Sequence, residues 1–410
     1  MSSVNRVLIG DYAHNIGRRS ALLPKISRTV KGKKCFQLVA SAQNRYRLCQ
    51  GGNAIRRYSA QLGLILMLAS TALAQTPPVG GNLNEIIAGA KREGTINLVW
   101  SQAVMGEERQ VQQHMANFNK LFGTSLNYRF SPGPSMPQQG NQLFMEYRAG
   151  QPASTDVFLA AILAISPFLQ HGMYLTVPWT KLAPGRISAN IVEGGGTLVR
   201  VVTSVSVVTY NTKLMPRPPA SLEGLLAPEW KGRIATTPYA AGFDVLLAND
   251  FWGEKKTIDF AKRFSQQVAG LIRCGEAERI LSGEYAALAI DCTSQSPQRW
   301  KERGAPIDFF VPSDAAQKRY YYVTVPKHAS HPNAGVLFSL YLLSAEGQKE
   351  MWDSMRTDLD TLPGSHIGEV VGKYETQGVR FKDITAEWWA KHPEIHDRLK
   401  QVTGIFSASK

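Results

Sequence analysis

The sequence has little cysteine and lacks the motifs of the common metal and nucleophile sites. Four of its 410 residues are cysteine. No C-x-x-C is present, so the spacing of zinc and dithiol redox sites is missing. There is also no G-x-S-x-G and no H-E-x-x-H, and Gly194-Gly195-Gly196 lacks the following lysine of a phosphate loop. These absences disfavour metalloproteases, α/β-hydrolases and P-loop NTPases.

The histidines also lack partners for metal binding. His328 and His331 are three residues apart, and His392 and His396 would lie one helical turn apart. The second pair has no matching carboxylate or cysteine at ligand spacing, and the first lies in a His-Pro turn. We interpret all four as ordinary surface histidines, and we expect no metal site and no cofactor.

Acidic residues are nearly absent from the start of the chain. The first 74 residues hold twelve lysines and arginines but one acid, Asp11, so most of the formal net charge of +14 lies there. The remaining chain is almost balanced. A balanced globular part lacks the basic surface that binds phosphates, so we expect no nucleic-acid partner.

No apolar run is long enough to span a bilayer. The run from Leu62 to Ala74 has 13 residues, against the roughly 20 that a spanning helix needs. It follows Arg56-Arg57 and ends in the small-residue site Ala72-Leu73-Ala74, which together are typical of a secretory signal. We expect cleavage after Ala74, a periplasmic protein and no stable membrane anchor, because Gln75 rather than a lipid-accepting cysteine follows.

Residues 1–55 precede this signal and are unusual for a secreted protein. We interpret them as the product of a start site placed too early. The alternative is an organellar targeting sequence, since the segment is basic, contains serine and is poor in acids.

Two cysteines, Cys274 and Cys292, remain after the expected cleavage. The periplasm is oxidising, so we expect a disulfide between them. The alternative is two buried thiols.

Helix and strand patterns alternate after residue 82, which predicts an α/β protein. Apolar strand patterns separated by amphipathic helices predict a first lobe with a parallel sheet. The strands are expected at Ile96–Trp100, Leu126–Phe130 and Thr155–Ala160, and the helices at Leu83–Glu93, Glu107–Leu121 and Gln142–Ala149. A loop is expected at 131–140.

A second α/β set follows, between two extended runs. Leu198 to Tyr210 is too long for an ordinary strand, so it is either a hairpin or a strand that runs between lobes. Arg319 to Val325 is the second run. The predicted boundaries are 1–74 for the extension and signal, 82–200 for lobe 1, 211–317 for lobe 2, and 318–410 for the return crossing and C-terminal helices that complete lobe 1. Two lobes joined by two crossings would place a ligand between them.

The segment from Val208 to Ile234 resembles the hinge-crossing segment of type II periplasmic solute-binding proteins, especially those near the ferric-iron receptors. It has a strand ending in Tyr210-Asn211, a proline-rich loop and Pro228-Glu229-Trp230-Lys231-Gly232. The segment from Val323 to Met351 is similar to the return strand and following helix of that family. The resemblance implies a two-lobed periplasmic-binding-protein-like fold and a monomeric receptor. Its partners would be a small-molecule ligand and the permease subunits of an ABC importer.

The resemblance to iron receptors implies an adjacent tyrosine pair after the strand that ends at Asp291. Here the loop reads Asp291-Cys292-Thr293-Ser294 and has no tyrosine. Tyr320-Tyr321-Tyr322 lies on the return crossing, where alternation points one or two of the rings inward. We therefore expect a small organic anion or polar solute, with ferric iron as the alternative ligand.

Strand-end loops and crossings supply the expected ligand-binding residues. Hydroxyls and helix N-terminal amides there suit a small anion, and Trp100 or Tyr239 would offer an apolar wall. The full set is Trp100, Ser101, Gln102, Ser131, Ala161, Tyr210, Thr237, Tyr239, Asp291, Thr293, Ser294 and Tyr321. A periplasmic enzyme on the same fold is a second alternative, with Cys292 beside Asp291 as its nucleophile. We expect a disulfide or inert thiol there instead, and no enzyme.

Overall fold

The computed structural model describes residues 25–26, 35–41, 44–49, 78–100 and 105–408. The chain divides into two units, Met1–Gln75 and Thr76–Lys410. In the first unit, β1 (Lys25–Ile26) pairs antiparallel with β2 (Cys35–Ser41), which pairs antiparallel with β3 (Asn44–Cys49). The predicted signal sequence lies outside the described residues.

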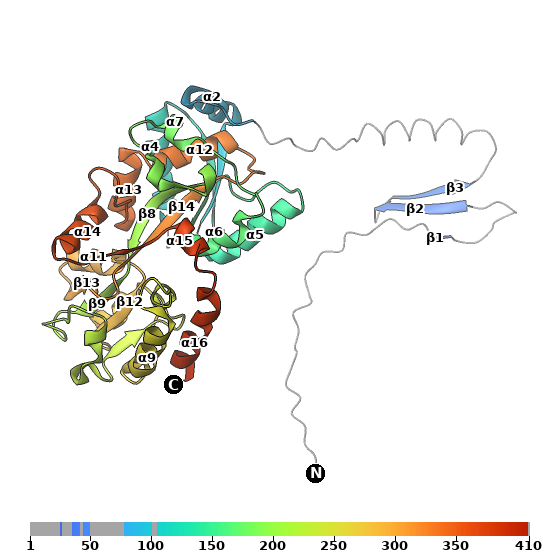
Figure 1. Ribbon diagram of the computed structural model, residues 1–410. Helices are drawn as coiled ribbons and strands as arrows, with labels where there is room; N and C mark the ends of the chain where they lie inside the picture. Colours follow the sequence, from blue (N-terminus) through green and yellow to red (C-terminus); the bar gives the residue numbers. More distant parts are fainter. Residues whose placement is uncertain (1–24, 27–34, 42–43, 50–77, 101–104, 409–410) are drawn as a thin grey trace, which may run out of the picture. The chain divides into compact units, whose positions relative to one another are not determined.

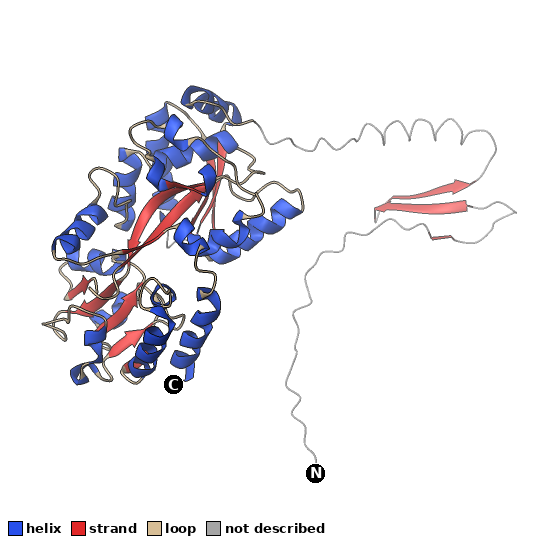
Figure 2. Cartoon of the chain, viewed as in Figure 1, coloured by secondary structure: helices blue, strands red, loops and turns tan. Residues whose placement is uncertain are grey.

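The second unit contains two lobes, and its strands gather in two groups flanked by helices (Figures 1 and 2). The lobe-1 strands are β4 (Thr95–Trp100), β5 (Asn127–Pro132), β6 (Phe158–Ala161), β7 (Val192–Glu193), β8 (Leu198–Val205), β14 (Gln317–Thr324) and β15 (Lys382–Ile384). Strands β4 and β5 are parallel, and a parallel bridge at Val157 joins β4 to the start of β6. Strand β14 runs antiparallel to both β6 and β8.

Helices cover the lobe-1 sheet. They are α2 (Leu83–Glu93), α4 (Glu108–Phe122), α5 (Met136–Arg148), α6 (Ile162–Leu169), α7 (Trp179–Leu182), α12 (Pro332–Leu342), α13 (Ala345–Met355), α14 (His366–Thr376) and α15 (Ala386–Ala390). Short 3₁₀ turns lie at Ala189–Ile191 and Gly194–Gly196. Every residue of α12 is buried. This helix is therefore central to the lobe, as its continuous apolar sequence requires.

Lobe 2 is a five-stranded sheet in the order β11-β10-β12-β9-β13. Its elements are β9 (Val207–Asn211), β10 (Ile234–Thr236), β11 (Val268–Leu271), β12 (Ala287–Asp291), β13 (Ile307–Phe310), α8 (Phe243–Leu246), α9 (Gly253–Ser265), α10 (Ala277–Leu281), α11 (Gln295–Glu302) and α16 (Ile395–Ala408), with 3₁₀ turns at Glu223–Leu226 and Pro228–Trp230. Strands β10, β11 and β12 are parallel, and β9 is antiparallel to β12.

Local capping explains two differences from the predicted elements. The expected loop at 131–140 is already helical from Met136, because Ser135 and Gln138 form a capping box and Pro137 fits the first turn. The sequence from Ala334 to Met355 predicts one long helix, but the structure has two. Ser344 ends the first run and caps α13, accepting from the backbone N of Gly347 at 3.0 Å.

The C-terminal helices do not all complete lobe 1. Val402 and Phe406 of α16 are buried in the lobe-2 core, against α8 and α9. The last helix thus packs on lobe 2, whereas the sequence pattern predicted that it would complete lobe 1.

Candidate functional site

The strand ends of both lobes meet the same crossing segments. In lobe 2, β12 ends at Asp291, which lies opposite Val207, the first residue of β9. In lobe 1, β6 ends at Ala161, which lies opposite Tyr321 on β14. Between the lobes, the backbone N of Ser206 donates to the carbonyl of Gln317 at 3.3 Å. The carboxyl ends of β6, β10 and β12 therefore face the junction of the lobes, which is where α/β proteins bind ligands.

A bonded group of residues forms the lobe-2 side of this junction. The structure pairs Cys274 with Cys292 in a disulfide. The Asp291 carboxylate accepts from the backbone N of Gly275 at 3.0 Å and from the Thr209 hydroxyl at 2.8 Å. The Tyr239 hydroxyl accepts from the backbone N of Cys274 at 2.9 Å, while the residue remains 45% exposed. Tyr239 is thus held at its oxygen and presents its ring to solvent.

The backbone is strained at two of these loops. Ala240 has φ +51° and Ile290 has φ +52°, in the left-handed region that residues with a Cβ rarely adopt. Ile290 is β-branched, which makes the conformation costlier. Gly242 permits it, since a Cβ there would lie 2.2 Å from Cγ2 of Ile290. Strain of this kind gathers at binding and catalytic sites.

Two side-chain contacts join this group to the crossings. The Ser204 hydroxyl donates to the carbonyl of Cys292 at 2.8 Å. The Arg319 guanidinium makes a bidentate pair with Asp244 on α8, and its NH2 group also donates to Gln317 Oε1 at 3.0 Å. Ser204, Asp244 and Arg319 were not among the predicted site residues. The signal for Arg319 was its place beside Lys318, directly before the three tyrosines of β14.

Burial raises the pKa of Asp291 to about 6, although hydrogen bonds from Thr209 and Gly275 act in the opposite direction. The carboxyl is 1% exposed. Its contacts hold the loops after β11 and β12 together, so the buried carboxylate fixes the positions of these loops without itself being exposed to a ligand.

Several predicted site residues are buried. Trp100 is 1% exposed and stacks on Phe338 inside lobe 1, so its ring is not the expected exposed wall. Thr237 is fully buried, and its hydroxyl accepts from the backbone N of Ala241 at 2.7 Å. Ser294 is 3% exposed. These side chains build the loops rather than offering free groups to a ligand in this structure.

The remaining predicted residues divide between the junction and other places. Tyr239, Thr293, Ala161 and Tyr321 lie at the junction and are partly or well exposed. Tyr210 does not, because it lies opposite Ala287 at the far end of β12 and packs on Phe310. Ser131, near the end of β5, is exposed. Ser101 and Gln102 lie outside the described residues.

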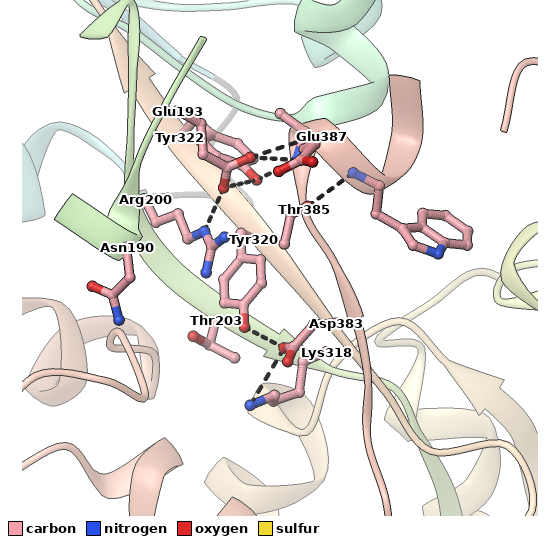
Figure 3. Close-up of polar contacts among 12 residues, drawn as sticks. Asn190, Glu193, Arg200, Thr203, Lys318, Tyr320, Tyr322, Asp383, Thr385 and Glu387 are labelled. Atoms are coloured by element: carbon pink, nitrogen blue, oxygen red, sulfur yellow. Dashed lines mark hydrogen bonds and ion pairs between the residues drawn. The ribbon is translucent and has the colours of Figure 1, made fainter. Parts of the chain in front are cut away.

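The three tyrosines of β14 alternate in direction. Tyr320 donates to Asp383 at 2.5 Å and Tyr322 donates to Glu193 at 2.9 Å, on one face of the sheet (Figure 3). Burial, followed by the neighbouring carboxylates, raises the pKa of both phenols. Tyr321 points to the opposite face, and burial raises its pKa too. The hydroxyls of Tyr320 and Tyr322 are therefore engaged by carboxylates in this structure.

Other geometric features lie away from the junction. A cavity of about 340 Å³ on lobe 1 is lined mainly by apolar side chains of α2, α4, α7 and α12, with Arg186 at its edge. Within the described ranges, no three histidine, cysteine or carboxylate side chains gather as a metal site. The part of the chain that the structure describes has no helix long and apolar enough to cross a membrane.

Solved structures share this architecture. The substrate binding protein of an ABC transporter from Agrobacterium tumefaciens has a TM-score of 0.62 and 15% identity, covering 78% of this chain and 96% of that chain. Iron-bound HitA from Pseudomonas aeruginosa has a TM-score of 0.58 and 17% identity, covering 76% and 99%. The spermidine/putrescine substrate-binding protein PotD from Streptococcus pneumoniae has a TM-score of 0.57 and 11% identity, covering 75% and 99%.

At these identities the likeness shows the fold, and it confirms the predicted two-lobed α/β architecture. No curated protein matches the chain in sequence. The family model for bacterial extracellular solute-binding proteins matches residues 113–363, which is more than half of the chain and spans both lobes. The chain therefore belongs to the family of bacterial extracellular solute-binding proteins.

Proposed function

We propose that this protein is a periplasmic receptor that binds a small organic anion or polar solute between its lobes and delivers it to the permease subunits of an ABC importer. The observation that carries the proposal is the lobe-2 surface around Tyr239. Its ring is exposed at the junction while its hydroxyl is tied to the backbone of Cys274. A fixed aromatic face costs little conformational entropy on binding.

Polar groups beside this ring suit a solute with acceptor atoms. Thr293 is partly exposed and carries a hydroxyl. The contacts of Arg319 with Asp244 and Gln317 occupy four of its five N–H groups. The fifth would be available to a ligand carboxylate or hydroxyl. A mostly apolar surface with a few fixed donors is typical of small-molecule sites.

Two observations favour this function over the alternatives. Cys292 is bonded to Cys274, so its sulfur is not a free nucleophile for an enzyme. For iron, the phenols of Tyr320 and Tyr322 are already bound to carboxylates, and their pKa values are raised. We therefore propose a binding protein without enzymatic activity, and an organic ligand rather than ferric iron.

A thermal-shift screen of carboxylates, sugars, polyamines and ferric citrate tests the proposal. We expect one organic solute to raise the melting temperature, because a ligand that binds only the folded state stabilises it by RT ln(1 + [L]/Kd). It should bind with 1:1 stoichiometry and be recovered unchanged. Consumption of the solute over many turnovers would instead identify an enzyme, and stabilisation by ferric citrate alone would identify an iron receptor.

Variants of Tyr239 then locate the site. Tyr239→Ala should weaken binding of the solute found in the screen about three- to tenfold, since one aromatic contact contributes about 0.5–1.5 kcal/mol. Tyr239→Phe keeps the ring and should retain most of the affinity. Met145→Ala is a matched control, because Met145 is a large, 65% exposed apolar residue near the end of α5 and away from the junction. Equal affinity of the wild type and Tyr239→Ala would remove Tyr239 from the site.

A further inference from the structure

The C-terminal segment forms a connection between the lobes in addition to the two crossings near Ser206 and Gln317. Strand β15 pairs with β14 at Gln317–Arg319, and α15 packs on α6 of lobe 1. The chain then continues through residues 391–394 to α16, which packs on lobe 2. Only these four residues, which form turns, separate α15 on lobe 1 from α16 on lobe 2.

The lobe-1 end of this segment is held by Glu193. Its carboxylate accepts from the backbone N of Ala386 at 2.6 Å and of Glu387 at 3.3 Å (Figure 3). The Tyr322 hydroxyl donates to the same carboxylate and accepts from Ala386 N at 3.0 Å. Glu193 is also paired with Arg200, and both side chains are about nine-tenths buried. The first turn of α15 is thus fixed to lobe 1 by buried, charge-assisted hydrogen bonds.

The other end is held by lobe 2. Val402 and Phe406 of α16 are buried in the lobe-2 core. Arg398 donates to the carbonyl of Leu247 at 3.3 Å and pairs with Glu254 at 3.1 Å. A rotation of one lobe against the other must therefore bend the chain between α15 and α16.

Asp250 contacts the segment across this bend. It lies between α8 and α9, beside Phe251 and Trp252, which pack against the lobe-2 core. Its carboxylate accepts from the Lys382 ammonium and from Trp388 Nε1 at 3.0 Å, and it lies 3.3 Å from His392 Nε2. Lys382 belongs to β15 and Trp388 to α15, so one lobe-2 carboxylate binds both lobe-1 elements.

Further contacts fix the positions of Trp388 and His392 beside Asp250. His392 stacks on Trp388 at 4.2 Å between centroids, and its Nδ1 lies 2.7 Å from the carbonyl of Trp388. Burial opposes ionisation of Asp250, but the hydrogen bonds from Lys382 and Trp388 outweigh it and lower its pKa. The carboxylate is therefore charged at neutral pH. At 44% exposure, its contacts are open to water and can be broken at modest cost.

We propose that Asp250 is a latch that holds the C-terminal crossing to lobe 2 and restrains the hinge motion between the lobes. The latch favours the arrangement in which Lys382 and Trp388 reach Asp250. Moving the lobes apart breaks both contacts, so the strength of the latch contributes to the balance between conformations that a ligand shifts.

Hydrogen exchange followed by mass spectrometry tests the latch on the ligand-free full chain. Asp250→Asn removes the charge and should accelerate exchange about three- to tenfold at 385–394 and also at the two other crossings, 204–207 and 315–318. Trp388→Phe keeps an aromatic ring but removes the N–H donor, so it should give a smaller acceleration in the same segments. Asp259→Asn is the matched control, because Asp259 is an exposed carboxylate of α9 in the same lobe.

The pattern of exchange distinguishes a latch that restrains the hinge from a local contact. Acceleration at all three crossings in Asp250→Asn, with none in Asp259→Asn, supports the latch. Acceleration confined to 385–394 would show a local tie that does not restrain the hinge, and the proposal would be wrong. Unchanged exchange, or equal acceleration throughout lobe 2, would also overturn it. Because no ligand is used, the result is independent of the proposed solute.

Discussion

At the scale of single residues, Asp291 shows how a buried charge can organise a binding surface. It is 1% exposed, yet it accepts hydrogen bonds from Thr209 and from the backbone of Gly275. The disulfide and the Tyr239 hydroxyl join the same loops. The loops that hold the exposed ring of Tyr239 are therefore held together in part by the buried Asp291 carboxylate. Burial destabilises the ionised form of that carboxylate.

The stability of the protein should consequently depend on the charge of Asp291. Its pKa is raised from 3.8 to about 6 in the folded state. Between these values the folded state binds more protons than the unfolded state, so stability falls as pH rises through this window and stays lower above it. The shift corresponds to about 3 kcal/mol.

Urea unfolding of the wild type and Asp291→Asn from pH 4 to pH 7 measures this effect. The wild type should lose about 2.4 kcal/mol relative to the variant between pH 4 and pH 7, because the variant cannot ionise there. Asp259→Asn, at an exposed position, should follow the wild type. Parallel profiles for the wild type and Asp291→Asn would show that Asp291 titrates normally.

The sequence pattern predicted which loops lie at the junction of the lobes better than which side chains are exposed there. Tyr239 and Thr293 followed from their places after strands. Trp100 and Thr237 followed from the same rule but are buried. Trp100 is the last inward-facing residue of β4 itself. Thr237 directly follows β10, whose three residues are all buried. Asp244 and Arg319 meet across 75 positions of sequence, and no local pattern encodes such a pair.

At the scale of elements, the strand and helix periods predicted most of both lobes. The patterns at Leu83–Glu93 and Ile96–Trp100 correspond closely to α2 and β4, because each has a clear apolar pattern and Gly94 marks the boundary between them. The run from Leu198 to Tyr210 was left open between a hairpin and an interlobe strand. It is an interlobe strand in two parts, β8 and β9, which belong to different sheets.

The disulfide acts at this same scale, since it joins the loop after β11 to the end of β12. Cys274 and Cys292 are separated by 18 positions. Closing a loop of this length stabilises a protein by roughly 3 kcal/mol in the chain-entropy model. The double variant Cys274→Ser/Cys292→Ser should therefore lose about 3 kcal/mol in urea unfolding. It should also bind the solute more weakly, because Cys274 holds the Tyr239 hydroxyl.

Thiol alkylation of the native wild type provides the control for that comparison. No reaction at Cys274 and Cys292 is expected without reductant, and both should react after reduction and unfolding. If both residues are alkylated in the native, unreduced protein, the bond is absent and the stability argument fails with it.

At the scale of the whole molecule, we expect the two lobes to be rigid and motion to occur at the three connections between them. Each lobe has its own apolar core. A smaller apolar cluster at the crossings includes Val205, Val207 and Val311. Polar contacts lie beside it, as for Ser204 with Cys292 and Arg319 with Asp244. Two separate cores joined by a small cluster and a few polar contacts favour rigid-body rotation about the crossings over deformation within a lobe. This is the motion that a receptor enclosing a solute requires.

The last prediction concerns which part of the chain reaches the periplasm. Residues 1–75 and 76–410 form separate units, and the predicted cleavage after Ala74 lies next to this boundary. Removing the first unit would also remove most of the positive charge, leaving a nearly balanced protein.

Signal cleavage needs small residues at the positions of Ala72 and Ala74, and tolerates change between them. Mass spectrometry of the exported protein should therefore give Gln75 as its first residue. Ala72→Leu/Ala74→Leu should accumulate as uncleaved precursor, while the control Leu73→Val is processed normally. An exported protein that retains Met1, or equal processing of all three chains, would contradict this interpretation of the N-terminal region.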